Sequence, residues 1–320
     1  MPRQGKWPLI IGSERGLYGI DSGGNTRLLW PDGAVRKILG KGDYWAILSD
    51  RGILVSSDLF HWESRNEGLP VKTIKVYEEG QKSFVSLVQE IKDLEIHPEN
   101  PEIMVCATKD QVFLSQNAGR SWKNLGAPPY RTNGIKAVAA ANLPELTVFL
   151  SHSVYGVYYI TPEKNGARWT ELNRGLEKLE TTDNPDEVSD IAVVLSGGRT
   201  EADAAGEARP IIYAAQTFRR RLYRLDWEGK QFLPIWSDST AFGTADSLDI
   251  GEGVIRFVRE GAVVELNYPD VHNPAGSYPP QSLSFRRRPD IVEFINTVSA
   301  NLGIKPYCLT FQENILRPDS

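Results

Sequence analysis

The sequence has few cysteines and no long apolar run. Among its 320 residues are 2 cysteines, Cys106 and Cys308, and each lies inside a short apolar segment. Neither has a Cys-x-x-Cys partner or a nearby histidine, so we interpret both as buried thiols rather than as metal or redox groups. No segment approaches the roughly 18 consecutive apolar residues that a membrane-spanning helix needs. The sequence therefore predicts no transmembrane segment.

The chain also lacks an excess of positive charge. Its formal net charge is -5, so there is no general electrostatic reason for it to bind nucleic acid or an acidic bilayer. The 4 histidines are scattered without the spacing of metal ligands. The phosphate-binding pattern Gly-x-x-x-x-Gly-Lys-Ser/Thr does not occur. We therefore expect no nucleic-acid partner, no metal and no cofactor.

The amino-terminal apolar run, residues 8–12, is too short for the core of a signal peptide. We expect a soluble, cytoplasmic protein. A chain from which a leader had been removed would look the same, so an exported form stays open.

What the sequence does contain is a repeated pattern of short strands. The clearest copy combines an alternating strand at 91–96, apolar strands at 102–107 and 111–115, and a polar turn that ends at Trp122. With a further strand beyond Trp122, this copy makes a four-stranded meander. Related copies lie at 46–62 and 148–169.

The spacing of the copies predicts the architecture. Opening strands recur at Ile38, Leu94, Val138, Ile191 and Leu248. This spacing matches the blade of a β-propeller, about 40 to 50 residues, with insertions. One such unit cannot bury its apolar face alone, so the copies must pack around one another. We predict an all-β fold, a single β-propeller domain over residues 1–320, with six blades favoured and seven as the alternative.

The first unit lacks an opening strand of its own, because it begins directly at Trp7. A ring of sheets leaves exposed edges unless the chain ends pair, so we expect the tail to supply this strand, from 282–285 or from 307–311. Between these two segments the sequence predicts a helix over 288–303. Its apolar positions 291, 294, 295, 298 and 302 share one face, and Gly303 ends it.

Two insertions interrupt the repeats. Two alternating segments within 71–90 predict an elongated hairpin, and the Gly-, Ala- and acid-rich segment 196–208 predicts a loop.

The turn that ends at Trp122 resembles the Asp-box, or bacterial neuraminidase repeat, with the pattern Ser-x-Asp-x-Gly-x-Thr-Trp. Asn117 takes the place of the acid and Ser121 that of Thr, while the other motif positions match at Ser115, Gly119 and Trp122. A second copy, one residue shorter, matches at Ser56, Asp58 and Trp62, and a third keeps Gly166 and Trp169. By this resemblance, residues 9–270 are similar to sialidase-, sortilin- and xyloglucanase-type propellers.

We interpret these motif residues as structural. A short carboxylate or amide can accept backbone N–H bonds inside the turn, Gly supplies a positive φ, and Trp fills the gap beside the next strands. The resemblance does not extend to sialidase chemistry. The string closest to the Arg-Ile-Pro motif of sialidases, Ala208–Ile211, lies late in the chain and in the wrong order.

Two basic runs with aromatic neighbours stand out on this acidic chain. They could bind an anionic partner, such as an acidic protein surface, a phosphate or a lipid headgroup. The alternative is a solvated turn. The candidate partner-binding residues are Arg219, Arg220, Arg221, Arg224, Arg286, Arg287 and Arg288.

Asp93 and Asp190 occupy equivalent points in two opening strands, which normally line the central channel of a propeller. Two channel carboxylates could act as general acid and base on a glycosidic bond, as the resemblance to xyloglucanase-type propellers implies. The alternative is that each caps a strand or meets a basic side chain.

Two functions follow from these observations. The first is a non-catalytic propeller that binds another protein as a scaffold, assembly factor or accessory subunit of a complex. Propellers of this type include receptors and photosystem assembly factors. The second is a glycoside hydrolase or carbohydrate-binding propeller that uses Asp93 and Asp190. We favour the first because the sequence holds no full catalytic signature.

Overall fold

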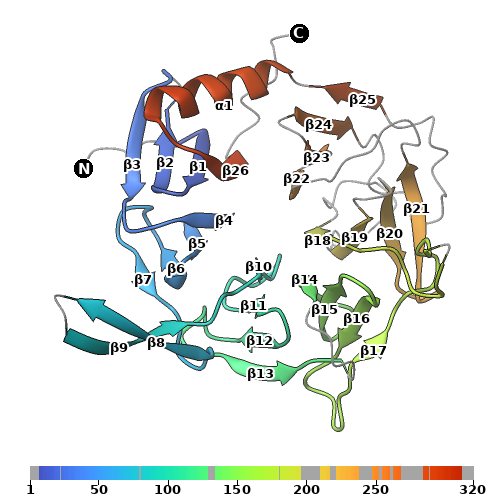
Figure 1. The fold of residues 1–320 in the computed structure, drawn as a ribbon. Coiled ribbons are helices and arrows are strands. Elements are labelled where there is room, and N and C mark those ends of the chain that lie inside the picture. Colours follow the sequence, from blue (N-terminus) through green and yellow to red (C-terminus); the bar gives the residue numbers. More distant parts are fainter. Residues whose placement is uncertain are drawn as a thin grey trace.

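The computed structural model describes most of the chain (Figure 1). The described residues are 7–21, 23–78, 81–128, 134–179, 181–195, 210–216, 221–237, 247–251, 254–259, 262–267, 284–287 and 289–311. The predicted loop at 196–208 lies outside them, as do Arg219, Arg220 and Arg288.

Six four-stranded antiparallel sheets stand around a ring in this part of the chain, and a seventh sheet is a two-stranded hairpin (Figure 1). From the inner to the outer strand, the first three blades contain β26 (Pro306–Phe311), β1 (Leu9–Ser13), β2 (Gly16–Ile20) and β3 (Thr26–Trp30); β4 (Val35–Lys41), β5 (Tyr44–Ser49), β6 (Gly52–Ser56) and β7 (Glu63–Ser64); and β10 (Asp93–Ile96), β11 (Met104–Ala107), β12 (Val112–Ser115) and β13 (Lys123–Gly126).

The last three blades contain β14 (Ile135–Asn142), β15 (Leu146–His152), β16 (Gly156–Ile160) and β17 (Thr170–Glu171); β18 (Asp190–Leu195), β19 (Pro210–Gln216), β20 (Arg221–Asp226) and β21 (Gln231–Ser237); and β22 (Ser247–Gly251), β23 (Val254–Arg259), β24 (Ala262–Asn267) and β25 (Ser284–Arg287). The prediction of a β-propeller with six blades is confirmed.

Both faces of the second blade are buried, because it packs between the first and third blades. In β5, the side chain of Ile47 joins the apolar cluster between the first and second blades, together with Ile10 of β1. Its neighbours Ala46 and Leu48 point to the opposite face and join the cluster between the second and third blades. Such strands therefore read as continuous apolar runs in the sequence.

The carboxyl-terminal strand closes the ring. β26 pairs antiparallel with β1, with Ile11 opposite Leu309 and Gly12 opposite Cys308. A Cβ atom on Gly12 would lie 2.5 Å from Cys308 Sγ, so this close approach requires glycine. Of the two predicted tail strands, the second closes the first blade. The first becomes β25, the outer strand of the last blade.

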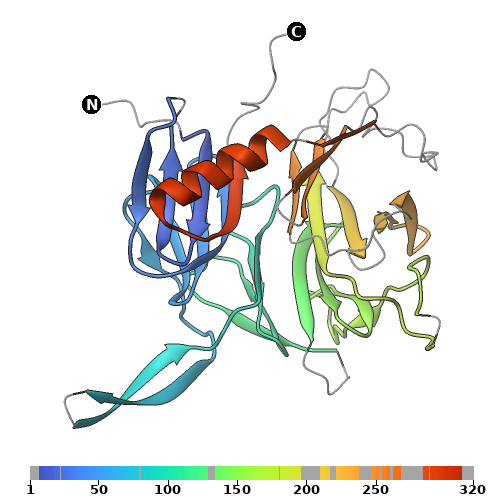
Figure 2. The ribbon, with the colours of Figure 1, turned by 45° about the horizontal axis from the view of Figure 1, so that its top comes forward.

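The predicted helix is α1 (Pro289–Leu302), which connects β25 to β26 and lies against the first blade (Figures 1 and 2). Ile295 and Val298 pack there with Ile11 and other side chains of β1 and β2. The prediction that position 294 shares this buried face is wrong. Phe294 is 44% exposed, because the helix turns the line of 295, 298 and 302 toward the blade and leaves 294 at its edge.

The hairpin consists of β8 (Val71–Glu78) and β9 (Gln81–Val88), in agreement with the predicted insertion at 71–90. It follows the second blade in the chain and projects away from the ring (Figure 2). No helix in the described part of the chain is long and apolar enough to span a membrane.

Candidate functional site

Charged side chains from three blades meet at the inner edge of the ring. Lys37 of β4 places its Nζ 2.6 Å from Asp93 Oδ1 and 2.5 Å from Glu95 Oε1, both on β10. Asp190, at the start of β18, is close enough to act electrostatically on Lys37 and Glu95. We call these four residues the channel cluster.

Asp93 connects three blades. Its side chain is 8% exposed, and its two oxygens have different partners. Oδ1 accepts from Lys37 of the second blade, while Oδ2 accepts the backbone N–H of Val138 in β14 at 2.8 Å. A carboxylate with both oxygens bonded in this way holds neighbouring blades in register.

Burial and charge oppose each other in the channel cluster. Burial raises the pKa of Glu95 from its ordinary value of 4.5 to about 7, although Lys37 lowers it. Burial alone would lower the pKa of Lys37, but the carboxylates of Asp93, Glu95 and Asp190 hold it well above its usual 10.5. Lys37 therefore stays protonated and compensates the buried carboxylates.

These contacts bear on the predicted catalytic pair. A general acid or base needs an oxygen within hydrogen-bond reach of the substrate. Both Asp93 oxygens are used inside the protein, which is the arrangement expected if this residue meets a basic side chain. Asp190 is half-buried and has protein contacts of its own. Glycoside hydrolysis by Asp93 and Asp190 stays a prediction.

The described arginines of the two basic runs lie in neighbouring blades. Arg221 begins β20 in the fifth blade, and its guanidinium pairs with Glu177. Burial lowers its pKa, but hydrogen bonds to Tyr223 and Glu177 outweigh burial and raise it. Arg224 lies opposite Tyr213 in the same sheet. Arg286 and Arg287 belong to β25, opposite Glu265 and Val264. Partner binding by these arginines stays a prediction.

Two of the three turns that resemble the Asp-box are closed by hydrogen bonds within the motif. Asp58 Oδ1 accepts the N–H groups of Phe60 and His61, each at 2.8 Å. Asn117 Oδ1 likewise accepts the N–H of Ser121 at 2.9 Å. The hydroxyls of the motif serines also bond within each turn, Ser56 to Asp58 and Ser115 to Asn117.

The shorter turn, at 56–62, has one residue with a positive φ where the turn at 115–122 has two. Ala118 and Gly119 have φ values of 57° and 77°, whereas in the shorter turn Leu59 alone has a positive φ, of 68°. Leu59 is 5% exposed and packs between the first and second blades, and this burial offsets the backbone strain.

The tryptophans that end the turns connect blades. Trp122 is buried between the second and third blades, and its Nε1 donates to Arg65 O of the preceding blade at 2.8 Å. Trp169 donates to Leu125 O at 3.2 Å, again in the preceding blade. Trp62 instead donates to Leu59 O inside its own turn. The later two tryptophans therefore tie successive blades together.

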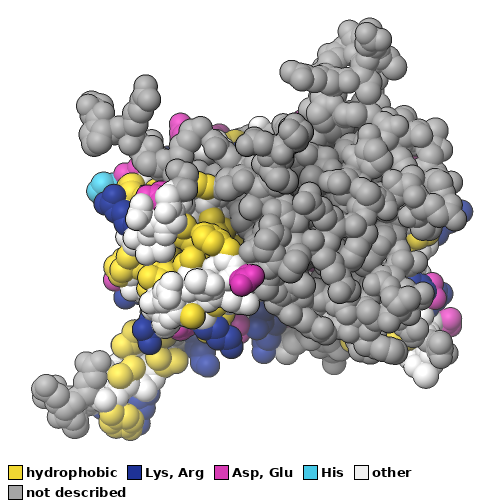
Figure 3. Space-filling model, turned by 90° about the horizontal axis from the view of Figure 1, so that it is seen from above, with side chains coloured by type: hydrophobic (Ala, Val, Ile, Leu, Met, Phe, Trp, Pro, Cys, Tyr) yellow, Lys and Arg dark blue, Asp and Glu magenta, His cyan; other side chains and the backbone are white. Residues whose placement is uncertain are grey.

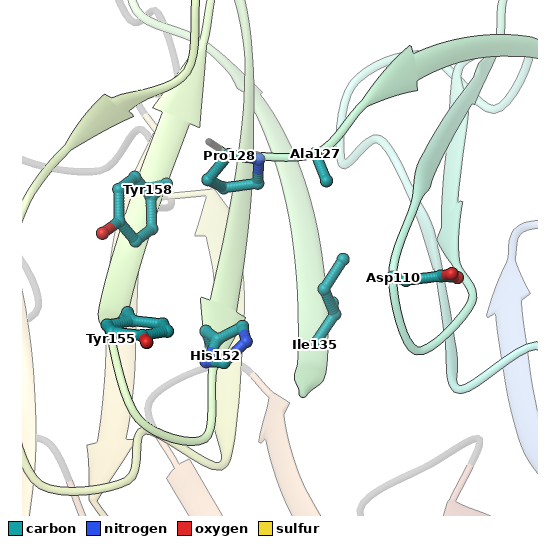
Figure 4. Close-up of a pocket in the computed structure, with 7 residues that line it drawn as sticks. All are labelled: Asp110, Ala127, Pro128, Ile135, His152, Tyr155 and Tyr158. Atoms are coloured by element: carbon teal, nitrogen blue, oxygen red, sulfur yellow. The ribbon is translucent and has the colours of Figure 1, made fainter. Parts of the chain in front are cut away.

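A small hollow lies between the third and fourth blades (Figure 4). Its lining residues are Asp110, Ala127, Pro128, Ile135, His152, Tyr155 and Tyr158. The His152 and Tyr155 rings are 5.0 Å apart, and His152 Nδ1 accepts the N–H of Val154. The enclosed space measures only about 10 Å³, room for about one water molecule and far too little for a small-molecule ligand. Sequence reasoning missed it because separate loops and strands contribute to it.

The hairpin carries an unusual concentration of exposed apolar side chains (Figure 3). Of the 9 large apolar residues exposed in the described part of the chain, 5 lie on it. These are Val71 (64% exposed), Tyr77 (65%), Phe84 (67%), Val85 (39%) and Leu87 (45%). The strand pattern predicted the hairpin, but whether its apolar residues are covered is a tertiary property.

One face of the hairpin combines aromatic and basic side chains. Tyr77 lies opposite Lys82, and Lys75 lies opposite Phe84, so all four side chains share this face. Lys75 Nζ is 4.7 Å from the centre of the Tyr77 ring, and Lys82 Nζ is 5.6 Å from that of Phe84. We call these four residues the lysine–aromatic face.

No protein-family model matches the chain, and no curated protein matches its sequence. Its similarity is to solved structures. The extracellular domain of BT4673 from B. thetaiotaomicron has a TM-score of 0.54 and 12% identity, with 88% of this chain and 32% of that chain covered. The chain thus spans about a third of that structure.

The β-propeller domain of Cps50 (Swd1) from Myceliophteria thermophila has a TM-score of 0.50 and 14% identity, and covers 79% of this chain and 70% of its own. YCF48 bound to D1 peptide has a TM-score of 0.47 and 12% identity, with 88% and 77% covered, and no inference is drawn from that score. Similarity at such low identity extends to the fold alone. The chain is a β-propeller.

Proposed function

We propose that this propeller is a non-catalytic, protein-binding scaffold, assembly factor or accessory subunit, and that the hairpin β8–β9 is its main contact element. The observation that carries this proposal is the set of exposed apolar side chains on an element that projects from the ring. Exposed apolar groups gathered on one element are typical of a surface that a partner covers.

The energetics favour binding by the hairpin. Full burial of a side chain such as Phe84 or Leu87 contributes about 1.5–3 kcal/mol, so a few of these residues could anchor a partner. Tyrosine and phenylalanine lose little conformational entropy when they become ordered at an interface. The blades themselves do not depend on these side chains, because the clusters between them are composed of other residues.

The arginine runs offer a weaker basis for the proposal. Arg221 is already paired with Glu177, so an anionic partner would have to compete for its guanidinium. We therefore assign these arginines a secondary role, as a second contact in the fifth and sixth blades.

We also propose that the chain is related to the Asp-box propellers. The support is the internal hydrogen bonding of the turns at 56–62 and 115–122 and the blade-connecting Trp122. In related chains, when sequences are compared, we expect Ser, Asp or Asn, and Trp at these positions. Relatives that keep the blades but lose these residues would contradict the relationship.

The scaffold proposal is tested by comparing matched pairs of exposed residues. The chain is cross-linked in its native cell, purified, and its cross-linked partners are identified. We expect the double variant Tyr77→Ser/Phe84→Ser to lose a partner that the wild-type chain captures. The control variant Leu28→Ser/Val154→Ser changes two apolar residues outside the hairpin that are 46% and 40% exposed, and it should retain the partner. Equal capture by both variants would contradict a contact through the hairpin.

A further inference from the structure

We propose that the lysine–aromatic face of the hairpin binds an extended, acidic segment of the partner protein, with carboxylates at alternate positions. This inference rests on the proposed function and deepens it, because it names the chemistry of the partner. It follows from the charge, the exposure and the strand pairing of the hairpin.

Among the described side chains, no carboxylate pairs with the lysines of this face. Some surface lysines elsewhere pair with carboxylates, as Lys92 does with Glu90 and Lys136 with Glu187. Neither Lys75 nor Lys82 forms an ion pair with a described side chain, and each lies over an aromatic ring instead. A carboxylate placed beside them would gain a charge-assisted hydrogen bond without breaking an existing ion pair.

The pattern of the face selects a partner with mixed character. Aromatic and basic side chains alternate along each strand, Lys75 with Tyr77 and Lys82 with Phe84, and they alternate across the strands as well. A purely acidic segment would leave the two rings exposed, and a purely apolar one would cover the lysines at a cost in desolvation. A segment with acidic and apolar residues satisfies both.

The strand topology favours an extended segment. Within the described residues, β8 and β9 pair only with each other, so the outer edge of each strand has backbone N–H and C=O groups without a strand partner. A peptide that adds to such an edge forms main-chain hydrogen bonds and directs alternate side chains to one face. Carboxylates at every second position would then reach the lysines.

The sequence of the hairpin tip argues against a lipid surface as the occupant. The sequence here contains Glu78, the last residue of β8, followed by Glu79, and the whole chain has a formal net charge of -5. An anionic bilayer attracts lysines but repels the acidic residues that the sequence places beside them. A protein segment lying along the side of the hairpin avoids that repulsion.

The proposal can be tested with a short fluorescein-labelled peptide in which Glu and Val alternate. Fluorescence anisotropy should show saturable binding to the full chain that weakens as NaCl is raised. The double variant Lys75→Gln/Lys82→Gln should bind about fivefold more weakly, as expected for two exposed ion pairs. The control Lys164→Gln/Lys178→Gln, which removes two exposed lysines outside the hairpin, should bind like the wild type.

Three results would overturn the proposal. One is the absence of saturable binding. Another is equal binding by Lys75→Gln/Lys82→Gln, and the third is equal binding of a peptide in which Lys and Val alternate.

Two further measurements would assign the face to another occupant. The chain is sedimented with vesicles of equal parts phosphatidylcholine and phosphatidylserine, and binding that the lysine variant loses would assign the face to a membrane. Dimerisation lost in that variant, measured by analytical ultracentrifugation, would assign it to a second copy of the chain.

The outcomes also separate this inference from the proposed function. If cross-linking to a partner depends on Tyr77 and Phe84 but not on Lys75 and Lys82, the scaffold proposal stands and the acidic segment does not. If neither pair affects cross-linking, both proposals fail.

Discussion

The channel cluster and the hairpin use the same kinds of side chain in opposite ways. In the channel, Lys37 is held by two carboxylates, and Asp93 also accepts a backbone N–H from a third blade. On the hairpin, Lys75 and Lys82 have aromatic rings beside them and no carboxylate among the described side chains. Aromatic residues differ in the same sense, since Trp122 is 6% exposed and Phe84 is 67% exposed.

This comparison separates residues that maintain the ring from residues available for a partner. Removal of the partner of a buried charge, or truncation of a buried ring, lowers the free energy of unfolding. An exposed one can be changed almost freely unless another molecule covers it. Paired substitutions in the two regions should therefore differ strongly in their effect on folding.

The largest difference is expected between two aromatic residues. Trp122→Ala removes a buried ring between two blades and its hydrogen bond to Arg65 O, and should lower the free energy of unfolding by about 4 kcal/mol. Phe84→Ala should change it by less than about 0.5 kcal/mol. Urea denaturation followed by tryptophan fluorescence and circular dichroism measures both. Similar losses for the two variants would mean that the hairpin belongs to the folded core.

A smaller difference is expected between lysines. Lys37→Met leaves Asp93 and Glu95 without their positive partner in a mostly buried site and should cost about 3 kcal/mol. Lys75→Met should have almost no effect, within about 0.5 kcal/mol. The midpoints of urea unfolding provide the measurement. If Lys37→Met is as stable as the wild type, the channel cluster does not hold the blades together.

The smallest effect concerns pH. The pKa of Glu95 is raised from 4.5 to about 7, so the folded protein binds a proton more tightly than the unfolded chain between these values. This contribution favours folding below about pH 4.5 and is lost as the pH rises through about 7. Glu95→Gln should flatten that part of the curve of stability against pH. Parallel curves for the variant and the wild type would contradict the raised pKa.

Much of the fold could be predicted because the determinants are local. Apolar runs bounded by turn residues marked the opening strands at Ile38, Leu94 and Val138, and these are the inner strands β4, β10 and β14. The helix and the hairpin likewise follow from periodicity over about 15 residues. Phe294 shows the limit, because its spacing fits the apolar stripe but the orientation of the docked helix leaves it exposed.

The candidate sites were less predictable. Asp93 and Asp190 stood out by their position in the repeat, but the partner that occupies Asp93, Lys37, is 56 residues away in the sequence. Neither Lys37 nor Glu95 has a sequence signal that distinguishes it from a surface charge. The hairpin was predicted as an element, while the exposure of Tyr77 and Phe84 depends on its projection from the ring.

The sequence by itself determined the repeating strands, the turns and the helix, because alternation, glycine and short polar side chains act within a few residues. Only the tertiary structure decided which tail strand closes the ring, since 284–287 and 307–311 are both short strands and their pairing depends on where the other blades bring them. It also decided which charges are paired, because the packing of the second blade against the third brings Lys37 and Asp93 together and leaves Lys75 and Lys82 outside.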